Sequence, residues 1–203
     1  MDEKTYNYYE THYEELTSRY ESVVNSLSSH FLESFRPNTK ILDIGCGSGR
    51  DLALLIRNGF DAFGVEPVSG FINQAEQFHP ELKGRIAKGQ LPNLGFPHGF
   101  QFDGILCSAV MMHLAPSQLP ESIQSIHRCL VKSGRLLISL PNNRTNLNSN
   151  FRDENGRLFS KVEVNEVEAI FNNHNFRLLR HWVDEDGLKR SGTDWNSFLF
   201  ESL

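Results

Sequence analysis

The sequence predicts an α/β protein with a doubly wound, mostly parallel seven-stranded sheet, helices on both faces, an N-terminal helical segment and a C-terminal antiparallel hairpin. Short apolar runs alternate five times with segments of helical periodicity, which is typical of a parallel sheet covered on both faces. The last two β-like runs, residues 176–183 and 195–203, leave no room for a helix between them. Two strands joined without a crossover helix must pair antiparallel.

The N-terminal segment, residues 5–35, carries one stripe of apolar side chains at spacings of three and four, which indicates one or two amphipathic helices. The stripe consists of Tyr9, Tyr13, Leu16, Tyr20, Val23, Val24, Leu27, Phe31 and Phe35. Pro37 then ends the helical pattern. We therefore expect a helical cap over residues 1–36 and a Rossmann-like core over residues 37–203, together forming one domain.

The core alternates between the two periodicities. The expected strands are residues 41–44, 61–65, 85–87, 102–108 and 135–140. The expected helices are residues 49–57, 69–79, 117–130 and 162–173. Because crossovers in such sheets are right-handed, ligand sites are expected at the carboxyl ends of the strands, near the point where the strand order reverses.

Two segments late in the chain stand apart from this alternation. Residues 141–157 are rich in Asn and Arg and almost devoid of apolar side chains, so they predict a long loop that is either a functional lid or a mobile connection. Farther on, Asp186, Arg190 and Trp195 are interpreted as a structural ion pair and anchor.

Composition limits the function classes. The chain has 203 residues, a formal net charge of −5 and three cysteines without framework spacing. An acidic balance argues against nucleic acid as a partner, since neutralising phosphates requires a basic face. No apolar run is long enough to span a membrane and no signal pattern is seen, so a cytoplasmic protein without a membrane partner is expected. The oligomeric state is not readable.

The first strand runs into a glycine-rich turn, Gly45-Cys46-Gly47-Ser48-Gly49, with Asp43 two residues before it. Glycines at this place let the backbone turn sharply and approach a ligand closely. Glu66 follows the second strand, where a carboxylate suits the two hydroxyls of a ribose.

Two ligand classes use this arrangement. A nicotinamide dinucleotide favours a third glycine at the position that Arg50 occupies. Asp43 is a poor neighbour for a pyrophosphate but a good one for a ligand that carries ammonium and sulfonium charges. The pattern therefore favours a ligand that carries ammonium and sulfonium charges over a nicotinamide dinucleotide.

Taken together, these motifs resemble the class I methyltransferases, the seven-stranded Rossmann-like family that uses S-adenosylmethionine. The resemblance covers essentially the whole chain. It rests on residues 42–50 (LDIGCGSGR), 65–67 (VEP), 102–105 followed by 112–114, and 130–139. The turn before the fifth strand departs from the family's usual Lys-Pro-Gly-Gly, because it reads Val131-Lys132-Ser133-Gly134.

The resemblance implies S-adenosylmethionine as cofactor, S-adenosylhomocysteine as its product, and a set of cofactor-binding residues. These residues are Asp43, Gly45, Cys46, Gly47, Ser48, Gly49, Glu66, Pro67, Gly89, Gln90, Leu91, Ser108 and Ala109. The glycine loop would hold the methionine end, the stretch around Gln90 would face the adenine, and Ser108 and Ala109 would approach the transferring methyl. The family often has an acid where this chain has Gln90.

His113 follows the fourth strand and is the candidate general base, with packing as the alternative role. Arg144 and Arg152 on the long loop are candidates for holding an anionic acceptor, unless they are simply solvated.

Several remaining residues have both a functional and a packing interpretation. Tyr9, Tyr13 and Tyr20 either close over the cofactor or pack the N-terminal helix. Cys46 is interpreted as a small filler of the glycine loop, and no metal site is expected.

A small-molecule acceptor is expected, and a protein or RNA acceptor stays open because this fold hosts all three classes. The chain lacks both the Asn/Asp-Pro-Pro-aromatic run of amino methylation of bases and the Pro-Cys nucleophile of carbon-5 pyrimidine methylation. Two alternatives stay open at this stage: a non-catalytic S-adenosylmethionine-binding or regulatory protein, and a nicotinamide-dependent oxidoreductase.

Overall fold

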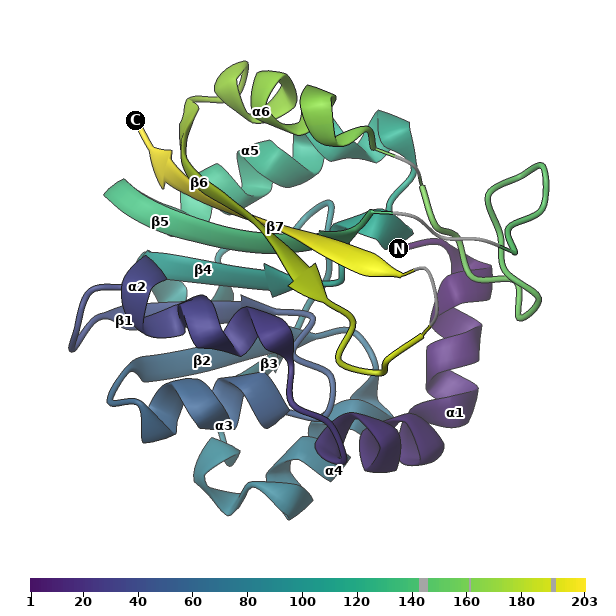
Figure 1. Ribbon diagram of the computed structural model, residues 1–203. Coiled ribbons are helices and arrows are strands. Elements are labelled where there is room, and N and C mark those ends of the chain that lie inside the picture. The colour runs from purple at the N-terminus through teal and green to yellow at the C-terminus, as the bar shows by residue number, and fades with distance from the viewer. Residues whose placement is uncertain (143–145, 161, 191–192) are drawn as a thin grey trace.

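A mixed sheet organises the molecule (Figure 1). The computed structural model describes residues 1–142, 146–160, 162–190 and 193–203, and the strands among them form one seven-stranded sheet in the order β3-β2-β1-β4-β5-β7-β6. Its strands are β1 (Lys40–Ile44), β2 (Asp61–Glu66), β3 (Ile86–Lys88), β4 (Phe102–Ser108), β5 (Leu130–Pro141), β6 (Phe176–Glu185) and β7 (Asp194–Ser202). The first five pair in parallel, and β7 pairs antiparallel with both β5 and β6. The predicted fold class is confirmed.

Helices cover both faces of this sheet. They are α1 (Glu3–Glu21), α2 (Phe31–Ser34), α3 (Arg50–Arg57), α4 (Ser69–Phe78), α5 (Leu119–Cys129) and α6 (Val164–Asn172). Short 3₁₀ turns lie at η1 (Ser26–His30), η2 (Pro80–Leu82), η3 (Pro97–Gly99), η4 (Met111–His113) and η5 (Pro116–Gln118). Within the described ranges, none of the helices has both the length and the apolar character needed to cross a bilayer.

Alternating side chains along the central strands divide the core into two layers. Leu42 and Ile44 of β1 join the apolar cluster under α5 and α6, whereas Ile41 joins the cluster formed with α2, α3 and α4. Successive residues of a strand point to opposite faces, so an uninterrupted apolar run is what a strand buried on both sides requires.

The N-terminal segment differs from the single apolar stripe that the sequence predicts. Helix α1 ends at Glu21, and the chain is extended before η1 begins at Ser26. Val24, which the periodicity places on the apolar face, is 78% exposed because the chain has already left the helix. The helical periodicity of the apolar side chains is therefore interrupted between α1 and η1.

Strand β5 begins earlier than predicted, at Leu130. Leu130 pairs with Phe102 of β4, and the turn expected at residues 131–134 is an irregularity inside the strand, with Ser133 at φ +59°. The helix expected from residue 117 begins at Leu119, because Pro116 starts a 3₁₀ turn first. Neither difference changes the topology.

Candidate functional site

A cavity of about 670 Å³ opens at the carboxyl ends of β1, β2 and β4. The strand order reverses between β1 and β4, so this is the position at which open α/β sheets bind ligands. Helix α1 and the segment 146–160 lie beyond this end of the sheet (Figure 1, right) and contribute residues to the cavity wall. A cavity of this size suits a small molecule of nucleoside dimensions together with a second compact ligand.

The glycine loop between β1 and α3 forms the floor of the cavity. Its backbone is tied to β2 because the Gly45 and Cys46 amides both donate to the Val65 carbonyl, at 2.8 and 3.2 Å. Gly45 and Gly47 have φ of +70° and +52°, which disfavours any residue with a Cβ. A Cβ on Gly45 would come within 2.6 Å of a Val110 methyl, whereas one on Gly47 would meet no atom within 4 Å.

Glu66, at the end of β2, is hydrogen-bonded to the glycine loop. Its carboxylate accepts hydrogen bonds from the Gly47 amide at 3.0 Å and the Val68 amide at 2.9 Å. The side chain is 5% exposed, and this burial raises its pKa to about 7 despite the two backbone donors. Each carboxylate oxygen can accept more than one hydrogen bond, so Glu66 retains the capacity to bind donor groups of a ligand.

Asp43 is the second buried carboxylate at the cavity. It is 2% exposed, and its Oδ2 atom has no hydrogen-bond partner within the described part of the chain. Burial, reinforced by repulsion from Asp51, raises the pKa of this carboxyl well above its usual range. A buried acceptor without a partner is costly. A donor or a positive charge on a bound ligand would relieve that cost.

The structure gathers nearly all the cofactor-binding residues that the sequence predicts around this one cavity. Those that line it are Asp43, Gly45, Cys46, Gly47, Ser48, Glu66, Pro67, Gly89, Gln90, Leu91, Ser108 and Ala109. Gly49 is not among the lining residues. A Cβ there would lie 2.5 Å from Leu82 Cδ1 and 2.9 Å from Ala75 Cβ, so Gly49 serves the packing of α3 against its neighbours.

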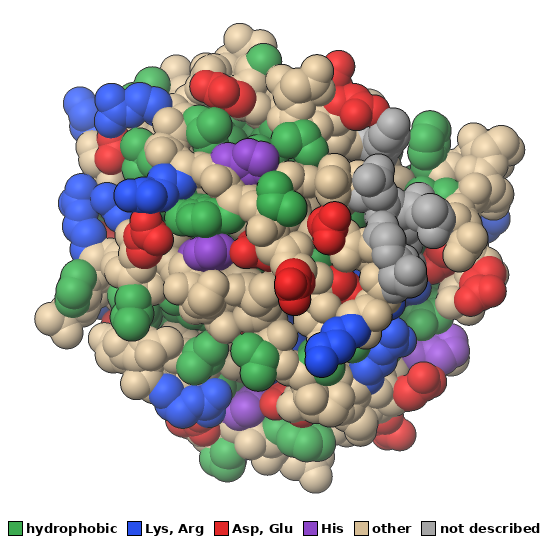
Figure 2. Space-filling view, viewed as in Figure 1, with side chains coloured by type: hydrophobic (Ala, Val, Ile, Leu, Met, Phe, Trp, Pro, Cys, Tyr) green, Lys and Arg blue, Asp and Glu red, His purple; other side chains and the backbone are tan. Residues whose placement is uncertain are grey.

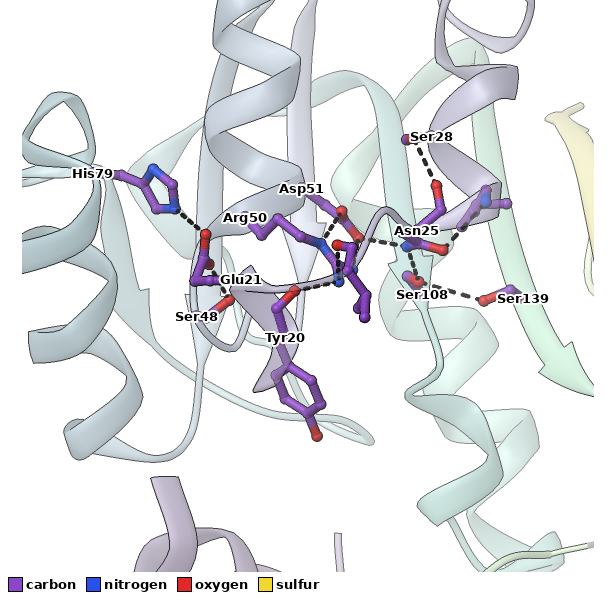
Figure 3. Close-up of polar contacts among 12 residues, drawn as sticks. Tyr20, Glu21, Asn25, Ser28, Ser48, Arg50, Asp51, His79, Ser108 and Ser139 are labelled. Carbon is purple, nitrogen blue, oxygen red and sulfur yellow. Dashed lines mark hydrogen bonds and ion pairs between the residues drawn. The ribbon is translucent and has the colours of Figure 1, made fainter. Parts of the chain in front are cut away.

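Arg50, which stands where a dinucleotide motif would have its third glycine, holds the N-terminal cap in place (Figure 3). Its guanidinium makes two hydrogen bonds with the Asp51 carboxylate, at 2.9 and 3.1 Å. It also donates to the Tyr20 and Val23 carbonyls at the end of α1, at 2.9 and 3.3 Å. These contacts of Arg50 form a clamp that fastens the cap to the glycine loop. A nicotinamide-binding motif has a glycine at this position and therefore no side chain that could make such contacts.

Asn25 and Glu21 extend this clamp, and sequence reasoning missed both. The Asn25 amide donates to Asp51 at 2.6 Å and to the Ser108 hydroxyl at 3.1 Å (Figure 3). Glu21 accepts from the Ser48 hydroxyl at 2.6 Å and contacts His79 at 3.1 Å. No motif or periodicity marks Asn25 and Glu21, because their partners lie far away in the sequence.

His113 lines the cavity just after β4 and is 5% exposed. Its Nδ1 lies 2.7 Å from the Leu158 carbonyl oxygen, and its Nε2 lies 2.8 Å from the Tyr9 hydroxyl. A carbonyl oxygen only accepts, so Nδ1 is the protonated nitrogen, and in the neutral ring Nε2 accepts from Tyr9. The sequence pointed to His113 but not to either of these partners.

The tyrosines of α1 divide between the two roles that the sequence left open. Tyr9 and Tyr20 line the cavity. Tyr13 packs on Gly70 of α4, where a Cβ would collide with the Tyr13 ring.

The segment 146–160 folds back on α1. Arg152 pairs with Asp2 at 2.9 Å and is not among the cavity-lining residues, while Arg144 lies outside the described residues. Arg157 does line the cavity, although the sequence did not single it out. Its guanidinium makes two hydrogen bonds with Asp153, at 2.9 and 2.6 Å, and lies 4.4 Å from the centre of the Tyr8 ring.

Asp186 and Cys46 also line the cavity. Asp186 receives hydrogen bonds from Arg190, at 2.7 and 2.9 Å, and from the Trp195 indole at 2.9 Å, which agrees with the structural ion pair that the sequence predicts. Cys46 is buried, and burial, reinforced by repulsion from Asp43, raises the pKa of its thiol well above the usual range. The thiol therefore stays protonated, as expected of a filler rather than a nucleophile.

Comparison with known proteins agrees with this geometry. A family model described as a methyltransferase domain matches residues 13–189. A protein-L-isoaspartate O-methyltransferase of Chlorobium phaeovibrioides is 34% identical over 113 residues, which is 54% of this chain and 44% of the relative. The chain thus aligns with less than half the length of this curated relative.

Solved structures share the fold over nearly the whole chain. A TehB-like S-adenosylmethionine-dependent methyltransferase from Corynebacterium glutamicum has a TM-score of 0.70 and 22% identity, over 95% of this chain and 99% of that one. A 1,6-didemethyltoxoflavin N1-methyltransferase from Burkholderia thailandensis, solved with that compound and S-adenosylhomocysteine, has a TM-score of 0.75 and 18% identity, over 95% and 84%. At these identities the likeness shows the fold alone.

Proposed function

This chain belongs to the class I S-adenosylmethionine-dependent methyltransferases, and we propose that it transfers a methyl group to a small-molecule acceptor. One observation carries the proposal. A single cavity brings together a glycine loop, a buried carboxylate at the end of β2 and a second buried carboxylate oxygen that has no partner among the described residues.

S-adenosylmethionine is the cofactor, and the residues at the cavity fit it. Glu66 would accept the ribose hydroxyls, and the Asp43 carboxylate would face the positively charged methionine end beside the loop from Gly45 to Gly47. Gly89, Gln90 and Leu91 would lie along the adenine. When bound, the cofactor supplies a methyl group on sulfonium sulfur, which is a good leaving group.

The chain's own residues mainly align the acceptor and exclude water. The clamp of Arg50 and Asn25 keeps the cap over the glycine loop. The Arg157–Asp153 pair orders the segment 146–160 against the aromatic side chains of α1.

The size and coverage of the cavity support a small-molecule acceptor. Helix α1 and the segment 146–160 line the same cavity as Ser108 and Ala109, the proposed place of the methyl group. On the face drawn in Figure 2, Lys and Arg side chains are interspersed with Asp and Glu side chains, in keeping with the net charge of −5. A nucleic-acid acceptor would favour a continuous basic surface.

The direct test is a calorimetric titration of the purified protein with S-adenosylmethionine, S-adenosylhomocysteine and reduced nicotinamide dinucleotides. We expect micromolar binding of both sulfur compounds and none of the nicotinamides. Transfer of a radiolabelled methyl group to an acceptor then separates an enzyme from a binding protein. Failure of well-folded protein to bind either sulfur compound would refute the proposal, and nicotinamide binding would favour an oxidoreductase.

Affinity for the nucleoside part of the cofactor should rise with pH. The pKa of Glu66 is about 7, and its ionised form is the better acceptor for ribose hydroxyls. Since the ionised fraction grows about tenfold between pH 6 and pH 8, affinity should rise by up to about tenfold over that range. The probe is 5′-methylthioadenosine, which has the ribose but lacks the amino group that titrates near this range.

The raised pKa of Glu66 also determines how the folding stability of the ligand-free protein changes with pH. A carboxyl whose pKa is raised on folding stabilises the ligand-free protein below its unfolded pKa, and that contribution is lost as the pH rises through about 7. Calorimetry of 5′-methylthioadenosine in two buffers of different ionisation enthalpy should detect proton release at pH 6. The Glu66→Gln variant should show no such release, and equal affinity of the native protein at pH 6 and pH 8 would contradict the prediction.

A further inference from the structure

Tyr9 and His113 form a hydrogen-bonded pair at the wall of the cavity, although they are 104 residues apart in the sequence. The Tyr9 hydroxyl lies 2.8 Å from His113 Nε2, and the two rings meet edge to face with centroids 5.5 Å apart. Tyr9 comes from α1 in the cap and His113 from η4, which follows β4, so docking of the cap is what creates the pair.

The orientation of the His113 imidazole is fixed by contacts on the side of the ring away from Tyr9. The Leu158 carbonyl accepts from Nδ1, and the Leu158 amide in turn donates to the Thr5 hydroxyl at 2.9 Å. The Phe159 ring lies edge-on to the imidazole, at 4.8 Å between centroids. This support leaves the Nε2 lone pair directed at Tyr9, the arrangement in which a histidine takes a proton from a hydroxyl.

Both ring nitrogens of His113 are therefore engaged, and a ligand reaches the imidazole through Tyr9. A tyrosine hydroxyl that donates to His113 keeps lone pairs with which it can accept from a ligand. Two acidic groups at the cavity are held in ion pairs: Asp153 is bound by Arg157, and Asp186 by Arg190.

We propose that Tyr9 receives the acceptor's proton while passing its own to His113, and that the acceptor is a small molecule with a hydroxyl or N–H group that loses this proton on methylation. This inference rests on the proposed methyltransferase function. It makes Tyr9 the catalytic residue that touches the acceptor and His113 the residue that acts through it.

The step balances. As the acceptor's oxygen or nitrogen bonds to the methyl carbon, the carbon–sulfur bond breaks and its electron pair stays on sulfur. The acceptor's proton moves to the Tyr9 oxygen, and the Tyr9 proton moves to His113 Nε2. The imidazolium, which the Leu158 carbonyl stabilises through Nδ1, then returns its proton to solvent after product leaves.

The experiment compares Tyr9→Phe and His113→Gln with the native protein, and uses Tyr6→Phe as the matched control. Tyr6 lies one turn earlier on α1, and its hydroxyl bonds to Glu10 on the exposed side. Methyl transfer from radiolabelled S-adenosylmethionine is measured to catechol, 8-hydroxyquinoline and benzimidazole, which bear a proton to lose, and to iodide, which has none. Affinity for S-adenosylhomocysteine is measured separately by calorimetry.

We expect the native protein to methylate at least one proton-bearing probe. On that probe Tyr9→Phe should lower kcat by about 100-fold with KM nearly unchanged, since general acid–base groups typically contribute 10²–10⁴-fold. Affinity for S-adenosylhomocysteine should stay within about twofold, and Tyr6→Phe should behave as native. Any transfer to iodide should be unaffected by Tyr9→Phe.

A second readout needs no acceptor. In the S-adenosylhomocysteine complex, the ¹⁵N signals of His113 should report a proton on Nδ1, and Tyr9→Phe should shift the Nε2 signal. Transfer to iodide alone, transfer to none of the proton-bearing probes, or an unchanged kcat in Tyr9→Phe would overturn the inference. If S-adenosylhomocysteine still binds in those cases, the failure belongs to this inference and not to cofactor use.

Discussion

Replacing Glu66 with alanine should weaken binding of S-adenosylmethionine and S-adenosylhomocysteine by about 100-fold or more. Hydrogen bonds to a charged group contribute about 1.5–3 kcal/mol each, and Glu66 is placed to accept from two ribose hydroxyls. The substitution also removes the acceptor of the Gly47 amide, which helps to hold the loop in shape. Calorimetric titration of the variant with S-adenosylhomocysteine measures the loss.

Two companion variants make this result specific. Glu66→Gln retains one acceptor oxygen and should fall between native and Glu66→Ala. Glu121→Ala removes a carboxylate from the exposed side of α5 and should bind as native. Circular dichroism and thermal unfolding must show that each variant is folded, and affinity of folded Glu66→Ala within threefold of native would refute the ribose assignment.

Replacing Gly49 with alanine should cost about 2–5 kcal/mol of folding stability. Gly49 has φ of +83°, a conformation that costs an L-residue about 1–2 kcal/mol. The new Cβ would also lie 2.5 Å from Leu82 Cδ1 and 2.9 Å from Ala75 Cβ, and overpacking of this kind typically costs about 1–3 kcal/mol. For a chain of this length the melting temperature should fall by roughly 4–20 °C in calorimetric scans.

Gly47→Ala is the matched comparison within the same loop. Its φ is +52°, but a Cβ there meets no atom within 4 Å, so only the conformational cost of about 1–2 kcal/mol applies. Since Gly47 lines the cavity beside Glu66, its variant should instead lose about tenfold in affinity for S-adenosylhomocysteine, a loss of about 1.4 kcal/mol. If Gly47→Ala proved the less stable of the two, the packing role assigned to Gly49 would be wrong.

The fold, and the grouping of most predicted cofactor residues around one cavity, could be predicted because their signals are local. A strand buried on both faces is mostly apolar, so the runs at 41–44 and 102–108 could be recognised although Asp43 and Asp103 interrupt them. A glycine turn followed by a carboxylate at the next strand end places both at one sheet edge, since parallel strands end together. Gly49 is the one predicted cofactor residue that does not line the cavity, because a motif does not distinguish a glycine that faces a cavity from one that packs against a helix.

The part of the cavity around His113 depends on contacts that no local pattern encodes. His113 could be singled out by its place after β4, but its partners come from Tyr9 and Leu158, 104 and 45 residues away. Arg50 was noticed only as a missing glycine, yet its guanidinium binds carbonyls at the end of α1. Asn25 carries no signal at all, although it joins Asp51 to Ser108.

The sequence by itself thus determined the α/β class, the antiparallel hairpin at the end of the chain and the loop and carboxylates that suit S-adenosylmethionine. Periodicity and short motifs report which way consecutive side chains face, and that is enough to order strands and helices. Only the tertiary structure decided that helix α1 ends at Glu21, that Tyr9 meets His113 and that Arg157 lines the cavity. Those outcomes depend on how separate elements pack against one another, and packing is set by the whole core at once.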